Sequence, residues 1–160
     1  ENVYRSGVPI SINFPFIENL SLKTVVFLHS KHKIDQSLEI FLSDLGVQSV
    51  VLTEPEESTP LSAKHKKSDH ITEETVIQAV SLLIDQSNHP ILLICETGKY
   101  RTGTVVACLR KLQRWSLSSI FEEYRRFTKD KVKVQNEQFI ELFDTDLVNI
   151  PLNKPHFLDS

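Results

Sequence analysis

A cysteine and an arginine six positions apart, Cys95 and Arg101, have the types and spacing most suited to chemistry. The apolar run Ile91–Ile94 directly before Cys95 is typical of a buried strand, and a helix is expected to begin at Arg101 and Thr102. A tight loop between a strand and a helix directs its backbone N–H groups toward one point, and the helix N-terminus adds positive charge there. The segment therefore predicts a site that binds a tetrahedral oxyanion and stabilises a thiolate.

The loop supplies a nucleophile, a clamp and a set of backbone donors. We expect the Cys95 thiolate to attack phosphorus, which forms a cysteinyl-phosphate that water then hydrolyses. Arg101 is expected to hold two phosphoryl oxygens with its planar guanidinium group, and Thr102 to donate its hydroxyl to the Cys95 sulfur. A glycine inside the loop permits the backbone angles of a tight turn. The predicted phosphate-binding residues are Glu96, Thr97, Gly98, Lys99, Tyr100 and Arg101.

Two other interpretations fit parts of this segment. A free cysteine is most often a small buried apolar residue, and that alternative applies to Cys95 at the end of a strand. The strand before it, Gly98 inside the loop and the helix after it favour the oxyanion-binding interpretation. A Walker-type phosphate loop is excluded, because Gly98-Lys99 is followed by Tyr100 and the earlier glycine is missing.

A phosphatase of this kind also needs an acid that protonates the leaving oxygen, usually from a separate loop. The polar segment 54–69 is expected to be a loop, and its carboxylates are Glu54, Glu56, Glu57 and Asp69. Asp69 is preferred because it lies nearest the helix that leads to the Cys95 strand. A solvated loop residue, or a helix cap near Thr72, is an equal alternative for Asp69. The lysines of the same segment, Lys64, Lys66 and Lys67, can instead form a phosphate clamp.

Strands that alternate with helices, followed by helices alone, predict the framework around the loop. Short β-branched runs at 24–28 and 49–52 indicate buried strands, and the apolar spacing between them indicates a helix that ends at Gly46. The fold class is therefore α/β, with a mostly parallel central sheet flanked by helices. Further helices are expected around Val76–Leu83, from Arg101 to about Trp115, after Ser116–Ser119, and over Glu137–Leu147.

Charge is distributed unevenly along the chain. The net charge is −3, yet residues 99–133 contain ten basic and three acidic side chains. A local positive field in an acidic protein favours an anionic small ligand over nucleic acid, which usually binds a domain that is basic overall. About half of these charges are expected on solvated helix faces.

Composition excludes several other classes of protein. Apolar residues make up 40% of the chain, which excludes disorder, and no apolar run reaches the roughly 18–20 residues of a membrane span. The two cysteines lack the spacing of a zinc site, and His29 and His32 lack a third ligand, so neither a metal nor a cofactor is expected. Cys108 is expected in the core. Two cysteines fit a reducing, cytoplasmic setting.

The 160 residues have the length of one domain. We expect a single phosphatase-like domain over residues 1–150, followed by a C-terminal tail over 151–160. The start at Glu1 and the absence of methionine suggest a piece of a longer protein.

The pattern Cys95-x5-Arg101-Thr102 resembles the signature of protein tyrosine and dual-specificity phosphatases, and more specifically the atypical dual-specificity phosphatases of plants and fungi. The resemblance implies the cysteine-phosphatase fold, cleavage of phosphoanhydride bonds in inositol pyrophosphates, and activity on phosphoprotein-type substrates. It also implies that Cys95 is the nucleophile, Arg101 the phosphate clamp and Lys99 a further contact to the polyanion. The other matching blocks are Val3-Tyr-Arg-Ser-Gly7, Asn13-Phe-Pro-Phe16, Cys108-Leu-Arg-Lys-Leu-Gln113, Trp115-Ser-Leu, Ser119-Ile-Phe, Glu123-Tyr-Arg-Arg-Phe127 and Phe139-Ile-Glu-Leu-Phe-Asp144.

Departures from the family pattern concern the groups that handle protons. The family usually reads His-Cys-x-x-Gly-Lys-His-Arg-Thr-Gly, whereas this chain has Ile94 in place of the first histidine and Tyr100 in place of the second. The first histidine orders the loop and favours the thiolate, so we expect a slower enzyme. The family's acidic-Gly-x-Lys-Glu-Pro stretch should fall near residues 62–67, where this chain has Ser-Ala-Lys-His-Lys-Lys and lacks the expected acid.

Together these features predict a cysteine-dependent phosphatase domain that acts on or binds phosphorylated polyanions, either inositol pyrophosphates or phosphoprotein-type esters, with weakened activity. The alternative is a catalytically impaired, phosphatase-like binding or scaffold subunit, and a third interpretation is a protein that reads phosphotyrosine. The expected partners are a phosphorylated small molecule or phosphoprotein as substrate, and related phosphatase-like subunits, with no nucleic acid.

Overall fold

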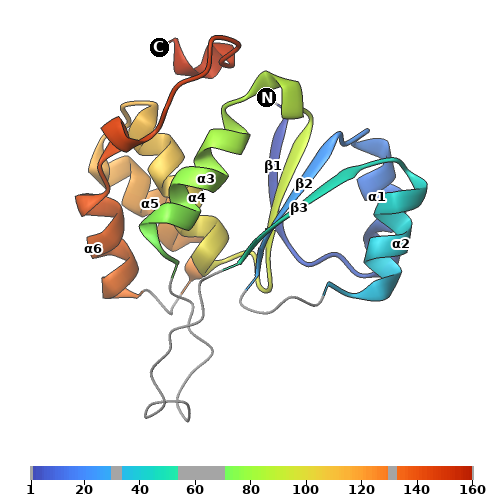
Figure 1. Ribbon diagram of the computed structural model, residues 1–160. Coiled ribbons are helices and arrows are strands. Elements are labelled where there is room, and N and C mark those ends of the chain that lie inside the picture. The colour runs from blue at the N-terminus through green and yellow to red at the C-terminus, as the bar shows by residue number, and fades with distance from the viewer. Residues whose placement is uncertain (1, 30–33, 54–70, 130–132, 160) are drawn as a thin grey trace, which may run out of the picture.

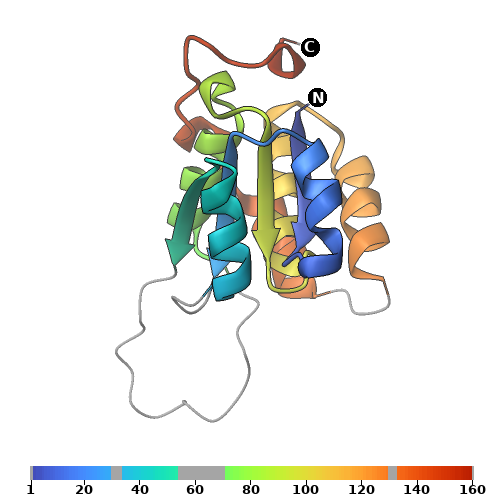
Figure 2. The ribbon, with the colours of Figure 1, turned by 90° about the vertical axis from the view of Figure 1, so that its right-hand side faces the viewer.

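The structure is a computed structural model that describes residues 2–29, 34–53, 71–129 and 133–159. Its described strands form a parallel four-stranded sheet in the order β1-β4-β2-β3. Helices α1 and α2 cover one face of the sheet, α3 and α4 cover the other, and α5 and α6 pack beyond α4 (Figure 1 and Figure 2). The elements are β1 (Val3–Gly7), α1 (Phe14–Asn19), β2 (Thr24–His29), α2 (Gln36–Asp44), β3 (Gln48–Thr53), α3 (Glu73–Leu83), β4 (Ile91–Cys95), α4 (Tyr100–Leu112), α5 (Leu117–Thr128) and α6 (Val134–Leu142).

The central strands are apolar throughout because both of their faces are covered by helices. In β2, Val25 and Phe27 join the cluster under α1 and α2, whereas Val26 and Leu28 join the cluster under α3 and α4. Successive side chains of a strand point to opposite faces, so a strand buried on both sides needs an unbroken apolar run. All five residues of β4 are buried for the same reason. The prediction of buried strands from apolar runs is confirmed for β2 and β4. The run at 49–52 forms the strand β3 as predicted, but its predicted burial is wrong, because β3 lies at the edge of the sheet and none of its residues is buried.

The order of the strands places the carboxyl end of β4 in the middle of the sheet. Cys95 is the last residue of β4, and it lies in register with Gly7 of β1 on one side and Leu28 of β2 on the other. All four strands point the same way, toward the lower edge in Figure 2. Ligands of parallel α/β sheets bind beyond the carboxyl ends of the strands, at the point where the strand order reverses. The topology therefore puts Cys95 at the position where such a sheet carries its site.

Several helix ends follow the predicted signals. Gly46 follows α2 with a φ of +68°, the left-handed conformation expected of a C-terminal glycine. Ser116 caps α5, where its side chain accepts a hydrogen bond from the N–H of Ser119. These two predictions are confirmed.

The predicted ends of two helices are wrong. Helix α4 ends at Leu112, before Trp115, because Arg114 turns into the left-handed region with a φ of +61°. The N–H of Trp115 then donates to the carbonyl oxygen of Arg110 at 3.1 Å and closes the helix. Helix α6 begins at Val134 and ends at Leu142, where the predicted span was 137–147. Its end is fixed from outside, because the Nζ atom of Lys111 donates to the carbonyl oxygens of Ile140, Glu141 and Phe143.

Candidate active site

The thiol of Cys95 lies at the end of the central strand, against the helix α4 side of the sheet. Cys95 is 4% exposed and belongs to the same apolar cluster as Leu93 and Val105. The following residues Glu96–Lys99 form the loop to α4, and in this loop Glu96, Thr97 and Lys99 are exposed. The strand–loop–helix arrangement expected from the sequence is present around Cys95.

Two glycines let the loop pack directly on the end of β1. Gly98 has a φ of +69°, and a β-carbon there would lie 2.3 Å from the backbone nitrogen of Gly7 and 2.6 Å from the carbonyl carbon of Ser6. A β-carbon on Gly7 would lie 3.1 Å from the carbonyl carbon of Thr97. The backbone of the loop therefore contacts the backbone of β1 directly, and only glycine fits at position 98 without displacing the loop or the strand. Gly7 is a part of this site that the sequence did not assign to it.

Helix α4 begins without the side-chain cap that several other helices carry. Asp35, Thr72 and Ser116 cap α2, α3 and α5, but Lys99 at the same position of α4 makes no capping hydrogen bond. The first N–H groups of a helix have no partner within the helix, and the helix dipole makes them positive. The first turn of α4 therefore offers its N–H groups toward the loop that follows Cys95, as an anion site requires.

Arg101 is the predicted phosphate clamp, and Thr102 is the predicted donor to the Cys95 sulfur. Both residues lie in the first turn of α4. Arg101 is 7% exposed, so its guanidinium group is enclosed by the protein. Thr102 is fully buried, and its Oγ1 atom makes no hydrogen bond to any described residue. The predicted bond from Thr102 to the Cys95 sulfur is thus not formed in this structure. The predicted acid, Asp69, lies outside the described residues, as do Glu54, Glu56, Glu57 and the lysines of the same segment.

Two basic residues from distant parts of the chain contact the loop or the first turn of α4. The Nη2 atom of Arg5, on β1, donates to the carbonyl oxygen of Gly98 at 3.0 Å. The Nζ atom of Lys133, before α6, lies 4.3 Å from the centre of the Tyr100 ring, within the range of a cation–π contact. From the sequence alone, Lys133 is predicted only as part of a basic segment and Arg5 has no assigned role. Arg5 lies in the segment Val3–Gly7 that resembles the family, and this resemblance was the one sequence feature that pointed to a role for Arg5.

Burial and neighbouring charges act on several groups around the loop. Burial lowers the pKa of Arg5, while the carboxylate of Glu123 and the Cys95 thiolate oppose that shift. Burial raises the pKa of the Cys108 thiol well above its usual range, so Cys108 stays a neutral core residue, as predicted. Burial also raises the pKa of Tyr124, whose ring lies against the first turn of α4 at Gly103.

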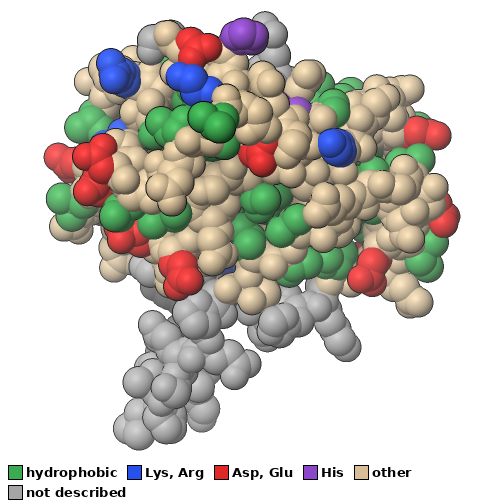
Figure 3. All heavy atoms as spheres, turned by 45° about the horizontal axis from the view of Figure 1, so that its top comes forward, with side chains coloured by type: hydrophobic (Ala, Val, Ile, Leu, Met, Phe, Trp, Pro, Cys, Tyr) green, Lys and Arg blue, Asp and Glu red, His purple; other side chains and the backbone are tan. Residues whose placement is uncertain are grey.

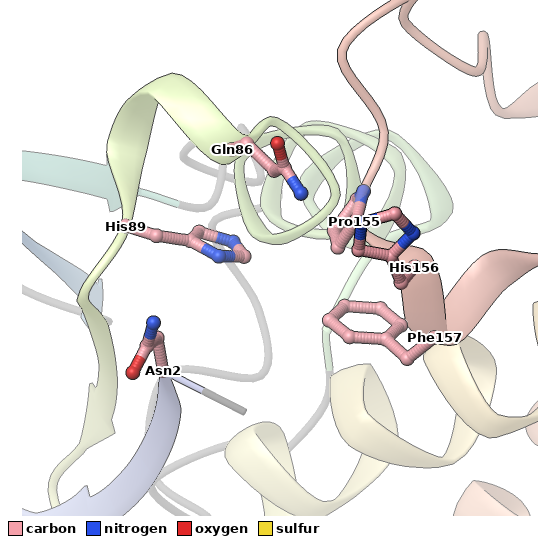
Figure 4. Close-up of a pocket in the computed structure, with 6 residues that line it drawn as sticks. All are labelled: Asn2, Gln86, His89, Pro155, His156 and Phe157. Carbon is pink, nitrogen blue, oxygen red and sulfur yellow. The ribbon is translucent and has the colours of Figure 1, made fainter.

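A separate pocket lies at the opposite end of the sheet. It has a volume of about 610 Å³ and is lined by Asn2, Gln86, His89, Pro155, His156 and Phe157 (Figure 4). Figure 3 turns this end of the molecule toward the viewer. Asn2 and His89 precede the first residues of β1 and β4, so the length of β4, roughly 15 Å, separates this pocket from Cys95. The pocket is therefore not part of the candidate active site.

The described residues, 2–29, 34–53, 71–129 and 133–159, form neither a metal-binding cluster nor a membrane-spanning helix. No group of three His, Cys, Asp or Glu side chains is placed there to hold a metal ion. Among the described helices, none has the length and apolar character needed to cross a membrane.

Comparison with known proteins connects this geometry to a family. Residues 1–159 match the family described as the tyrosine phosphatase family. The chain is 46% identical over 158 residues to the probable tyrosine-protein phosphatase DG1060 of Dictyostelium discoideum, which covers 99% of this chain and 90% of that protein. This chain belongs to the tyrosine phosphatase family.

The chain is also similar to a plant protein and to a protein of known structure. The inositol diphosphatase DSP4 of Arabidopsis thaliana is 36% identical over 152 residues, covering 94% of this chain and 73% of that protein. The core catalytic domain of the PP-IP phosphatase SIW14 from S. cerevisiae, solved in complex with citrate, is 34% identical with a TM-score of 0.77. That similarity covers 91% of this chain and 83% of the solved one. The predicted resemblance and fold class are confirmed, and the chain is a phosphatase of the cysteine type.

Proposed function

We propose that this chain hydrolyses phosphate groups from phosphorylated polyanions, with Cys95 as the nucleophile and inositol pyrophosphates or phosphoprotein-type esters as substrates. The observation that carries the proposal is the position of Cys95 between the central strand and the uncapped first turn of α4. In a member of the tyrosine phosphatase family, this is where a nucleophile and the N–H groups that bind its phosphate belong together.

The proposed reaction has two steps that share one set of residues. The Cys95 sulfur forms a bond to phosphorus while the bond from phosphorus to the leaving oxygen breaks, and an acid protonates that oxygen. Water then attacks phosphorus, the sulfur–phosphorus bond breaks, and the thiolate is regenerated. Arg101 and the N–H groups of the loop and of the first turn of α4 hold the phosphoryl oxygens through both steps. Asp69 remains the proposed acid.

Positive side chains at the edge of the loop support a substrate with more than one phosphate. Lys99 is exposed directly beside the predicted phosphate-binding N–H groups. Lys133 lies over the Tyr100 ring and brings a second cation to the same side of α4. Their charges suit a polyanion, whose additional phosphates extend beyond the group that reacts. The names of relatives such as the inositol diphosphatase DSP4 point to the same substrate class.

One observation favours the alternative of a phosphatase-like binding subunit with little turnover. Ile94, which stands where the related family has a histidine, is 1% exposed and packs in the apolar cluster with Phe27 and Leu92. An isoleucine offers neither a hydrogen bond nor a charge to the loop beside it. We therefore propose that activity is weakened relative to relatives that keep the histidine.

Phosphate release separates the two functions. The purified chain is incubated with an inositol pyrophosphate and, separately, with an aryl phosphate, and inorganic phosphate is measured. Cys95→Ser removes the proposed nucleophile. Cys108→Ala is the matched control, because Cys108 is a residue of α4 that is buried in the hydrophobic core. We expect release by the wild type and by Cys108→Ala, and none by Cys95→Ser. Wild-type phosphate release that does not exceed the release by Cys95→Ser would refute hydrolysis through Cys95 and favour the binding function.

A further inference from the structure

Arg5 reaches the candidate active site from an edge strand that supplies none of the predicted site residues. Its Nη2 atom donates to the carbonyl oxygen of Gly98 at 3.0 Å. The N–H at the other end of the same peptide group, that of Lys99, donates to the Oγ1 atom of Thr97 at 3.3 Å. The peptide group between Gly98 and Lys99 is thus held from both sides. Its orientation helps to set the curvature of the loop that follows Cys95.

Several contacts fix the guanidinium group of Arg5 before any substrate binds. It lies over the ring of Phe127 on α5, with its central carbon 3.9 Å from the ring centre. A β-carbon built on Gly103 would lie 3.6 Å from the Nη2 atom, which shows that Arg5 also lies against the first turn of α4. A group held in this way loses little conformational freedom when phosphate binds.

Neighbouring acidic groups stabilise the positive charge of Arg5. Burial disfavours the cation and lowers the pKa of Arg5, while Glu123 and an ionised Cys95 both favour the cation. Glu123 is itself held by Arg110, whose Nε and Nη2 atoms each lie 3.0 Å from a carboxylate oxygen. Two more titratable groups act on Arg5: the positive charge of Arg110 disfavours the cation, and Tyr124, also on α5, favours it.

We propose that Arg5 is a positioning residue, which holds the Gly98–Lys99 peptide in its phosphate-binding orientation and places a positive charge against the loop that follows Cys95. In this chain the residue directly before the nucleophile Cys95 is Ile94 and not a histidine. The proposal rests on the function proposed above for Cys95.

Two variants separate the charge of Arg5 from its packing. Arg5→Met keeps an aliphatic stem against Phe127 but removes the charge and the hydrogen bond to Gly98, whereas Arg5→Lys keeps the charge. Arg126→Met is the matched control, because Arg126 lies on the exposed side of α5 with a 71% exposed side chain. Three quantities are measured: the rate of alkylation of Cys95 by iodoacetamide at neutral pH, the affinity for inorganic tungstate, and kcat and KM for an aryl phosphate. Thermal unfolding of each variant reports on folding.

In Arg5→Met we expect slower alkylation, and tungstate affinity and kcat reduced about tenfold or more, as for the loss of a hydrogen bond to a charged group. Arg5→Lys should restore most of the alkylation rate, and Arg126→Met should match the wild type in every measurement. Wild-type alkylation and tungstate affinity in Arg5→Met would overturn the proposal, and equal losses in both Arg5 variants would overturn the role of the charge. If Arg5→Met does not fold, Arg5→Lys decides: tungstate binding at wild-type strength would overturn the positioning role, and weaker binding with alkylation retained would support it.

These measurements also separate this proposal from the proposed function. Alkylation and tungstate binding report on the loop without requiring turnover. A wild-type chain that binds tungstate and releases no phosphate would refute the enzymatic function, while the comparison between the Arg5 variants would still decide the role of Arg5.

Discussion

Replacing Gly98 with alanine is expected to abolish most phosphate release while the rest of the fold persists. The new β-carbon would lie 2.3 Å from the backbone nitrogen of Gly7 and 2.6 Å from the carbonyl carbon of Ser6. Comfortable non-bonded contacts are about 3.5 Å, so the loop or β1 must move by roughly 1 Å. A displacement of this size in a catalytic site costs about 100-fold in rate. The left-handed backbone adds about 1–2 kcal/mol of strain for a residue with a β-carbon.

Gly46 provides the matched control for the strain alone. Its φ of +68° nearly equals the +69° of Gly98, but a β-carbon built on Gly46 meets no atom within 4 Å. Gly46→Ala should therefore lose about 1–2 kcal/mol of stability, or roughly 2–8 °C in Tm, and keep wild-type kcat/KM. Gly98→Ala should lose at least as much stability and, in addition, about 100-fold in kcat/KM. The assay is phosphate release from an aryl phosphate, with thermal unfolding measured on the same samples. Wild-type kcat/KM in Gly98→Ala would refute the close packing of the loop on β1.

Two other substitutions test the clamp and the support of α4. Arg101→Lys should weaken binding of inorganic phosphate by about 1.5–3 kcal/mol in calorimetry, since lysine cannot offer two parallel donors; unchanged affinity would place the anion elsewhere. Tyr124→Phe should cost about 1–3 kcal/mol in urea unfolding, because the buried Nδ2 atom of Asn136 loses the phenol oxygen that accepts its 2.9 Å hydrogen bond. Burial raises the pKa of Tyr124, so its contribution to stability is complete below about pH 10 and is lost as pH rises through the folded-state value. The phenylalanine variant should lack this alkaline loss, and a loss of equal size in both proteins would contradict the assignment to Tyr124.

The sequence predicted the parts of the fold that depend on local patterns. The apolar runs of β2 and β4 reveal strands buried on both faces, and the spacing of Val76 and Leu83 reveals α3. The cysteine loop was predictable because its strand, its glycine and its helix follow one another along the chain. The edge strand β1 was not, since its half-buried residues mix polar and apolar side chains without an apolar run.

Contacts between distant residues limited the prediction of the site. Arg5 and Gly98 are separated by 93 positions, and no spacing rule connects them. Gly7 belongs to the site because the register of β1 and β4 places it opposite Cys95, and that register is a property of the folded sheet. The hydroxyl of Thr102 is buried as a helix position near the core requires, but its direction depends on packing that the sequence pattern does not specify.

Trapping the covalent intermediate tests directly whether Cys95 is the nucleophile. The wild-type chain is mixed with an excess of an aryl phosphate, denatured rapidly, and digested for mass spectrometry, with Cys95→Ser and Cys108→Ala treated in the same way. We expect a phosphoryl group on the peptide that contains Cys95 in wild type and in Cys108→Ala, and none in Cys95→Ser. Sustained phosphate release from Cys95→Ser, with no phosphoryl group on the Cys95 peptide of the wild type, would contradict the assignment of Cys95 as the nucleophile.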